Sequence, residues 1–272
     1  MDAVQKLENK TANGFHICVG LDTDKEKLPD HIKNLNDAEL IFNNEIIEAT
    51  KDVAAAYKIN FAFYEKDGTE GLKTLEKTLA LIPSNVLIIA DAKRGDIGNT
   101  SLMYAKSVFD YFNFDSITIN PYMGNDSVEP FLNYRNKLVF ILALTSNKGS
   151  GDFQKLKLAD GSFLFQNVIS KVHAWNKSGN CGIVFGATND SELKENLNLI
   201  GNLPVLLPGI GAQGGDLNSI AGLFNSNKKN NFLINVSRGI LYKSREKNFT
   251  AKAREELLNY NSKISKILFN AL

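Results

Sequence analysis

Short runs of apolar and β-branched residues recur along the chain, each bounded by turn-forming residues. Most of these runs are continuously apolar and do not alternate with polar residues. Continuous apolar runs are typical of parallel strands buried on both faces, whereas a half-exposed sheet gives alternation. The pattern predicts eight strands, at residues 17–21, 53–59, 86–90, 116–119, 138–144, 182–185, 205–207 and 232–236.

The segments between these runs carry apolar residues three or four positions apart, which is the spacing of one helix face. Such stripes predict helices that pack on the core. The clearest stripes are Ala38, Ile41, Phe42 and Ile46; Leu72, Leu75, Leu79 and Ile82; Leu217, Ile220, Ala221 and Phe224; and Ala253, Leu257, Tyr260, Ile264, Ile267 and Leu268.

Strands and helices that alternate eight times within about 250 residues fit a closed (β/α)8 barrel, a TIM barrel, better than an open doubly wound sheet. No Pro-rich or Ser-rich linker and no low-complexity tract divides the sequence. We therefore predict an α/β protein with a single barrel domain over residues 1–272.

Composition narrows the class of protein without identifying a function. Hydrophobic residues occupy 43% of the 272 positions and charged residues 22%, which are ordinary values for a globular domain. The formal net charge of +1 gives no electrostatic reason to expect binding to nucleic acid or to an acidic membrane. No apolar window reaches about 18 residues and the start of the chain is polar, so we expect a cytoplasmic protein without a membrane segment. Cys18 and Cys181 fall in predicted strands, which predicts buried, reduced thiols.

The densest charge cluster follows the third predicted strand, where residues 91–96 read Asp-Ala-Lys-Arg-Gly-Asp. Side chains alternate along a strand, so Asp91 and Lys93 should point to the same side. Nearby carboxylates keep an ammonium protonated, and such a fixed cation can stabilise a carbanion and then protonate it. The alternative is an ordinary strand end whose charges pair with one another in solvent.

Polar residues also follow other predicted strands, and in a barrel the carboxyl ends of the strands meet at one rim. Asp22 ends the first strand, Lys58 and Asn60 end the second, and Thr145 and Ser146 follow the fifth. Each could be ordinary loop polarity, but together they predict one polar site. The hydroxyls after the fifth strand suit hydrogen bonding to a polar heterocycle.

The last two strands predict a phosphate site. The seventh runs into the glycine-rich stretch Pro-Gly-Ile-Gly-Ala-Gln-Gly-Gly-Asp at residues 208–216, and Arg238-Gly239 follows the eighth. Glycines let backbone N–H groups approach an anion, and an arginine fork can bind phosphate. The loops after strands seven and eight are the usual phosphate position in this fold. A purely structural glycine turn is the alternative.

The block Asp-Ala-Lys-Arg-Gly-Asp-Ile-Gly-Asn-Thr at 91–100, together with the block at 208–216, resembles the orotidine 5'-phosphate decarboxylase family. The resemblance extends over nearly the whole chain. It is greatest to the branch with longer loops, found as stand-alone bacterial enzymes and in some protozoa. The polar insertion at 147–161 is one such loop, and a role as a lid is expected for it.

The resemblance implies decarboxylation of orotidine 5'-monophosphate to uridine 5'-monophosphate, without a cofactor or a metal. It makes Lys93 the proton donor to C6 of the pyrimidine, inside a charge network with Lys58, Asp91 and Asp96. It also implies a homodimer with shared active sites. The residues that would act across its interface are Asp96, Ile97 and Thr100.

For the rest of the substrate, the resemblance assigns Asp22 and Asn60 to the ribose hydroxyls or the charge network. Thr145 or Ser146 would contact the pyrimidine, and which of them does so stays open. The expected phosphate ligands are Gln213, Arg238 and Gly239. Two rival interpretations are a magnesium-dependent sugar-phosphate decarboxylase of the same barrel group and a catalytically silent nucleotide-binding scaffold.

Overall fold

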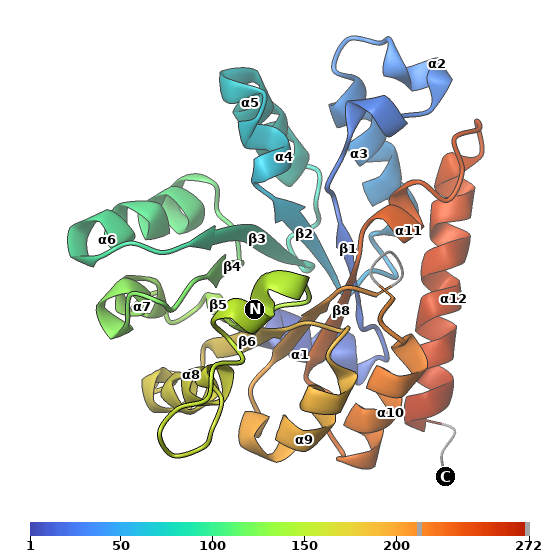
Figure 1. Ribbon diagram of the computed structural model, residues 1–272. Coiled ribbons are helices and arrows are strands. Elements are labelled where there is room, and N and C mark those ends of the chain that lie inside the picture. The colour runs from blue at the N-terminus through green and yellow to red at the C-terminus, as the bar shows by residue number, and fades with distance from the viewer. Residues whose placement is uncertain (211–213, 270–272) are drawn as a thin grey trace.

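Strands β1 to β8 form a closed barrel in chain order, and each strand is parallel to its neighbours (Figure 1). The computed structural model describes residues 1–210 and 214–269. Pairing of β8 with β1 closes the barrel, which confirms the predicted (β/α)8 fold. The strands are β1 (Ile17–Gly20), β2 (Ala56–Asn60), β3 (Leu87–Arg94), β4 (Ser116–Ile119), β5 (Leu138–Leu144), β6 (Cys181–Phe185), β7 (Val205–Pro208) and β8 (Phe232–Val236).

The helices surround the barrel (Figure 1). They are α1 (Ala3–Ala12), α2 (Asp30–Lys33), α3 (Ala38–Thr50), α4 (Ala62–Glu65), α5 (Gly68–Leu79), α6 (Gly98–Lys106), α7 (Asn125–Leu132), α8 (Leu164–Trp175), α9 (Asp190–Ile200), α10 (Leu217–Ser226), α11 (Arg238–Leu241) and α12 (Phe249–Phe269). Three short segments of other helical types are η1 (Lys25–Lys27), the π-helical η2 (Ser107–Tyr111) and η3 (Lys148–Asp152).

Alternation along the strands divides the core into two parts. One set of strand residues points outward and packs against the helices. The other set fills the barrel interior, and it includes Cys18, Ile89, Phe140 and Leu206. Both cysteines are buried and free, as predicted, and burial raises the pKa of Cys181 to about 12.

Helix α1 closes the amino-terminal end of the barrel. Ala3 and Leu7 pack against the interior cluster, and Lys6 Nζ lies 2.7 Å from Asp115 Oδ1. The same carboxylate accepts a hydrogen bond from the N–H of Ile88 on β3. With this end closed, the carboxyl ends of the strands form the open mouth of the barrel. The apolar pattern does not predict this helix, because its buried stripe is short and polar residues surround it.

Three details of the prediction are wrong. Residues 53–55 are not in β2, because the N–H groups of Val53 and Ala54 donate to the carbonyl of Thr50 and continue the turn that ends α3. Strand β3 runs to Arg94 and does not end at Ala90. Leu72 is 37% exposed and is not a core residue. The buried residues of α5 are Gly71, Leu75 and Thr78.

His16 is buried at the amino-terminal end of the barrel, directly before β1. Its ring stacks on Phe232 with the two ring centroids 4.1 Å apart. Nδ1 lies 2.9 Å from the carbonyl oxygen of Phe232, so Nδ1 carries the proton and donates it. Nε2 has no partner within residues 1–210 and 214–269. Because burial disfavours the charged ring, the pKa of His16 falls to about 4.

This burial predicts a loss of stability in acid. In the unfolded chain His16 takes up a proton near pH 6.5, whereas in the folded protein it does so only near pH 4. The free energy of unfolding should therefore fall by up to about 3 kcal/mol between these pH values. His16→Asn keeps a donor for the Phe232 carbonyl and does not titrate. Urea unfolding at pH 7 and pH 4.5 should show a weaker pH dependence in this variant, and an equal dependence would contradict the prediction.

Candidate active site

A bulge near the end of β3 positions the central charges. Ala90 on β3 pairs with Ile117 on β4, and the next paired residues are Arg94 and Ile119. Between these two pairs, β3 therefore contains more residues than β4. Within the bulge, Lys93 has a φ of 46°, a left-handed conformation that non-glycine residues rarely adopt. Its N–H donates to Thr118 Oγ1 over 3.1 Å, which holds the bulge in place. Backbone strain is therefore concentrated at the lysine that the sequence singled out.

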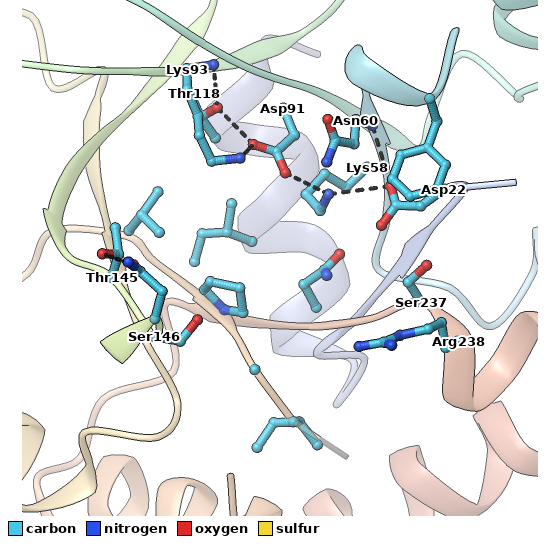
Figure 2. A pocket seen from close by; sticks show the side chains of 18 of the residues that line it. Asp22, Lys58, Asn60, Asp91, Lys93, Thr118, Thr145, Ser146, Ser237 and Arg238 are labelled. Carbon is cyan, nitrogen blue, oxygen red and sulfur yellow. Dashed lines mark hydrogen bonds and ion pairs between the residues drawn. The ribbon is translucent and has the colours of Figure 1, made fainter. Parts of the chain in front are cut away.

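Two carboxylates and two ammonium groups alternate along one side of the barrel mouth (Figure 2). Asp22 Oδ1 lies 3.6 Å from Lys58 Nζ, and Lys58 Nζ lies 2.7 Å from Asp91 Oδ2. The other oxygen of Asp91 lies 2.5 Å from Lys93 Nζ and accepts a 3.0 Å hydrogen bond from Thr118 Oγ1. The prediction that Asp91 and Lys93 point to the same side is confirmed.

Burial and charge fix the ionisation of this array. Burial alone would raise the pKa of Asp91, but the ammonium groups of Lys58 and Lys93 hold it well below its usual range. Burial alone would lower the pKa of Lys58, whose side chain is 4% exposed, but the carboxylates of Asp22 and Asp91 raise it. Asp91 therefore remains a carboxylate and Lys58 an ammonium at neutral pH, while the Lys93 side chain is 49% exposed and faces the opening.

The array borders a cavity of about 550 Å³ at the open mouth. Thr145 and Ser146 lie on the side of this pocket opposite Ser237 and Arg238 (Figure 2). The residues that form its apolar floor include Leu142, Val184 and Leu206. A cavity with one apolar surface, a charged row and an arginine fits a planar ring that carries anionic groups.

The loop after β5 sits close against the loop after β6. A Cβ atom at Gly186 would lie 2.6 Å from the backbone nitrogen of Ser146, so only glycine permits this approach. The Thr145 hydroxyl donates to Asn147 Oδ1 over 2.6 Å and accepts from Gln154 Nε2 over 2.9 Å. Thr145 is thus occupied by protein partners, and Ser146 is the other hydroxyl on this pocket wall.

The residues expected to bind ribose and phosphate line the same pocket, as far as the structure describes them. Asn60 donates its N–H to Asp22 Oδ1 over 3.3 Å, and both side chains line the cavity. Arg238 and Gly239 lie at the start of α11 and also line it. Gln213 lies outside the described residues.

Asp96, Ile97 and Thr100 are the predicted residues that this chain does not bring into its own pocket. None of them lines the cavity in the described part of the chain. Asp96 Oδ1 accepts the N–H of Ile97 over 2.8 Å, and Ile97 is 57% exposed. Asp96 and Ile97 directly precede α6 and Thr100 lies in its first turn, and Ile97 and Thr100 are exposed.

Sequence reasoning missed Thr118, Ser237 and Tyr242, which all line the pocket. Thr118 is on β4 between Ile117 and Ile119, which both pack outward with the helices, so strand alternation could have found it. The Tyr242 hydroxyl accepts the N–H of Asp24 over 2.7 Å, and burial raises the pKa of Tyr242 to about 12. No sequence pattern signals a contact between segments this far apart.

The described residues offer neither a metal site nor a membrane span. Within residues 1–210 and 214–269, no cluster of three or more His, Cys, Asp or Glu side chains has the arrangement of a metal site. In the same part of the chain, no helix combines the length and apolar character that crossing a bilayer requires.

Comparison with known proteins gives consistent matches. The model of the "Orotidine 5'-phosphate decarboxylase / HUMPS family" matches residues 16–253. An orotidine 5'-phosphate decarboxylase from Porphyromonas gingivalis is 47% identical over 243 residues, which are 88% of each chain. The structure of Leishmania donovani OMP decarboxylase superposes with a TM-score of 0.82 at 36% identity, over 97% of this chain and 99% of that one. The structure of L. donovani UMP synthase matches with a TM-score of 0.83 at 37% identity, and this chain spans 57% of its length.

Proposed function

Because this chain belongs to the orotidine 5'-phosphate decarboxylase family, we propose that Lys93 is the proton donor in the conversion of orotidine 5'-monophosphate (OMP) to uridine 5'-monophosphate (UMP). The protein is a carboxy-lyase of pyrimidine biosynthesis. The observation that carries the proposal is the 2.5 Å contact between Lys93 Nζ and Asp91 Oδ1, in the same pocket as Arg238.

The chemistry requires a fixed positive charge. When the bond from C6 to the carboxylate breaks, the electron pair stays on C6. No neighbouring carbonyl can delocalise this negative charge. An ammonium at this point stabilises the developing charge, and every ~1.4 kcal/mol of stabilisation raises the rate tenfold. Carbon dioxide leaves, C6 takes a proton from Lys93 Nζ, and the resulting amine regains a proton from solvent.

The other charged residues hold Lys93 in its reactive position. One oxygen of Asp91 forms an ion pair with Lys93 and the other with the buried Lys58. The carboxylate therefore cannot rotate without breaking an ion pair. The Thr118 hydroxyl donates to the Asp91 carboxylate and accepts the backbone N–H of Lys93, so it fixes both groups. Asp91 acts by orienting Lys93 and by stabilising the transition state, since the preorganised charges need no rearrangement during the reaction.

We assign the base contact to Ser146. The Thr145 hydroxyl already donates to Asn147 and accepts from Gln154, whereas the Ser146 hydroxyl has no hydrogen-bond partner among the described residues. The polar edge of the pyrimidine would meet Ser146 while the ring face lies on the apolar floor. Asp22 and Asn60 would hold the ribose hydroxyls.

Arg238 and Gly239 are proposed to bind the phosphate, together with Gln213. Arg238→Ala should lower kcat/KM for OMP by about 100-fold, because charge-assisted hydrogen bonds to the phosphate are lost while the reacting groups stay intact. Absorbance of OMP, followed as the C6 carboxylate is lost, measures the effect. Arg245→Ala is the matched control, since Arg245 is exposed and outside the pocket. Equal kcat/KM values in the two variants would remove the phosphate assignment.

A homodimer with shared sites would account for Asp96. An exposed apolar surface lies beside it, on α6 and on the loop before α7; its members include Ile97 (57% exposed), Met103 (46%), Tyr122 (77%) and Met123 (51%). Exposed apolar side chains on two neighbouring elements favour association. A second copy that docks on this surface would place Asp96, Ile97 and Thr100 at its partner's pocket.

Subunit mixing tests the shared site. Lys93→Ala and Asp96→Ala should each be almost inactive as homodimers. If Asp96 serves the partner's pocket, one of the two sites in a mixed dimer contains both native residues. Random exchange at equal concentrations should therefore restore about a quarter of the wild-type activity. Absence of any recovery, with exchange verified by native mass spectrometry, would contradict the shared site.

A further inference from the structure

Gln154 belongs to the insertion between β5 and α8, yet its side chain is fastened to the active-site loop. Its Oε1 accepts the N–H of Thr145 over 2.7 Å, and its Nε2 donates to Thr145 Oγ1 over 2.9 Å. The backbone of Gln154 is held on both sides, by Ser150 and by Phe165, each over 2.9 Å. One amide group therefore binds both the main chain and the hydroxyl of Thr145.

The same loop is also held by the segment after β6. Asn189 Nδ2 donates to the carbonyl of Thr145 over 3.1 Å, and Thr188 Oγ1 donates to the carbonyl of Ser146 over 3.2 Å. Lys155, the neighbour of Gln154, forms an ion pair with Glu192 on α9. Gln154 thus completes a set of contacts in which the N–H of Thr145 and the carbonyls of Thr145 and Ser146 all have fixed partners.

We propose that Gln154 is a positioning residue, which acts through Thr145 to keep the Ser146 hydroxyl directed at the pyrimidine. The inference rests on the proposed base contact of Ser146. Without the Gln154 amide, the N–H and the hydroxyl of Thr145 lose partners, and the loop can turn toward other arrangements. The insertion then contributes to the geometry of the pocket, in addition to any role as a cover.

Gln154→Leu has a similar size and removes both hydrogen bonds. We expect kcat/KM for OMP to fall by about 10-fold. Competitive inhibition by UMP should weaken by a similar factor, whereas inhibition by ribose 5-phosphate, which has no base, should stay unchanged. Gln154→Glu keeps the acceptor for the Thr145 N–H and should lower kcat/KM by a smaller factor. It provides a second variant if the leucine protein folds poorly. Asp160→Ala, which removes only the Asp160–Ser162 contacts at the tip of the insertion, should match the wild type.

A double-mutant cycle separates this role from a general effect on folding. In a Ser146→Ala background, Gln154→Leu should lower kcat/KM by no more than about 2-fold, since the group that it positions is absent. A full 10-fold loss in that background, equal weakening of ribose 5-phosphate inhibition, or no effect of Gln154→Leu in the wild type would each overturn the proposal. If Ser146→Ala alone is as active as the wild type, the base contact itself is wrong.

Discussion

Replacing Lys93 with alanine should abolish the decarboxylation of OMP and leave the barrel folded. The variant removes both the cation that we propose to face C6 and the proton that C6 would receive. Electrostatic stabilisation and general-acid catalysis each contribute about 100-fold or more, so kcat should fall by at least about 10,000-fold. The absorbance assay with purified protein measures this loss directly.

The stability of the Lys93→Ala protein is the control. The Lys93 side chain is 49% exposed in the wild type. In the variant, Asp91 keeps its contacts with Lys58 and Thr118, so the buried Asp91 and Lys58 charges remain paired. Urea unfolding should place the variant within about 1 kcal/mol of the wild type. An active Lys93→Ala protein would show that another group protonates C6.

Asp91→Asn should damage both activity and stability. Lys58 is 4% exposed, and without the Asp91 carboxylate its remaining carboxylate contact in the described structure is Asp22 at 3.6 Å. Removing one partner of a buried ion pair typically destabilises by about 3 kcal/mol, because the other charge stays buried. The released Lys93 also loses its orientation, so kcat should fall by about 100-fold or more.

A double variant separates these two consequences of Asp91. Lys58→Met with Asp91→Leu removes both buried charges, and apolar replacement of a buried pair is often neutral for stability. Urea unfolding should show that the double variant recovers most of the stability lost in Asp91→Asn, whereas the OMP assay should show no recovery of activity. A double variant that regains activity would mean that Asp91 supports only the fold.

The sequence predicts the barrel well because parallel strands buried on both faces leave long apolar runs. It also locates Asp22, Lys58, Asp91 and Arg238, since each lies near or just beyond the carboxyl end of a predicted strand and must therefore be at the mouth. Local pattern could not show the bulge that places Lys93 at a φ of 46°, because the bulge depends on pairing with β4.

Contacts between distant segments were also beyond local reasoning. The hydroxyl and the N–H of Thr145 are engaged by Gln154, which is nine positions further along the chain and folds back on the loop. Local pattern also cannot show the contacts that we propose for Asp96, since its expected partner is in another molecule. Within one chain, it contacts its own turn and not the charge array.

The most decisive measurement is a crystal structure of the protein with UMP bound. We expect C6 within about 3.5 Å of Lys93 Nζ, the distance of reacting groups, with the phosphate on Arg238 and the base edge on Ser146. A bound UMP whose C6 points away from Lys93, or whose phosphate lies elsewhere than at Arg238, would contradict the assignment of Lys93 as the proton donor.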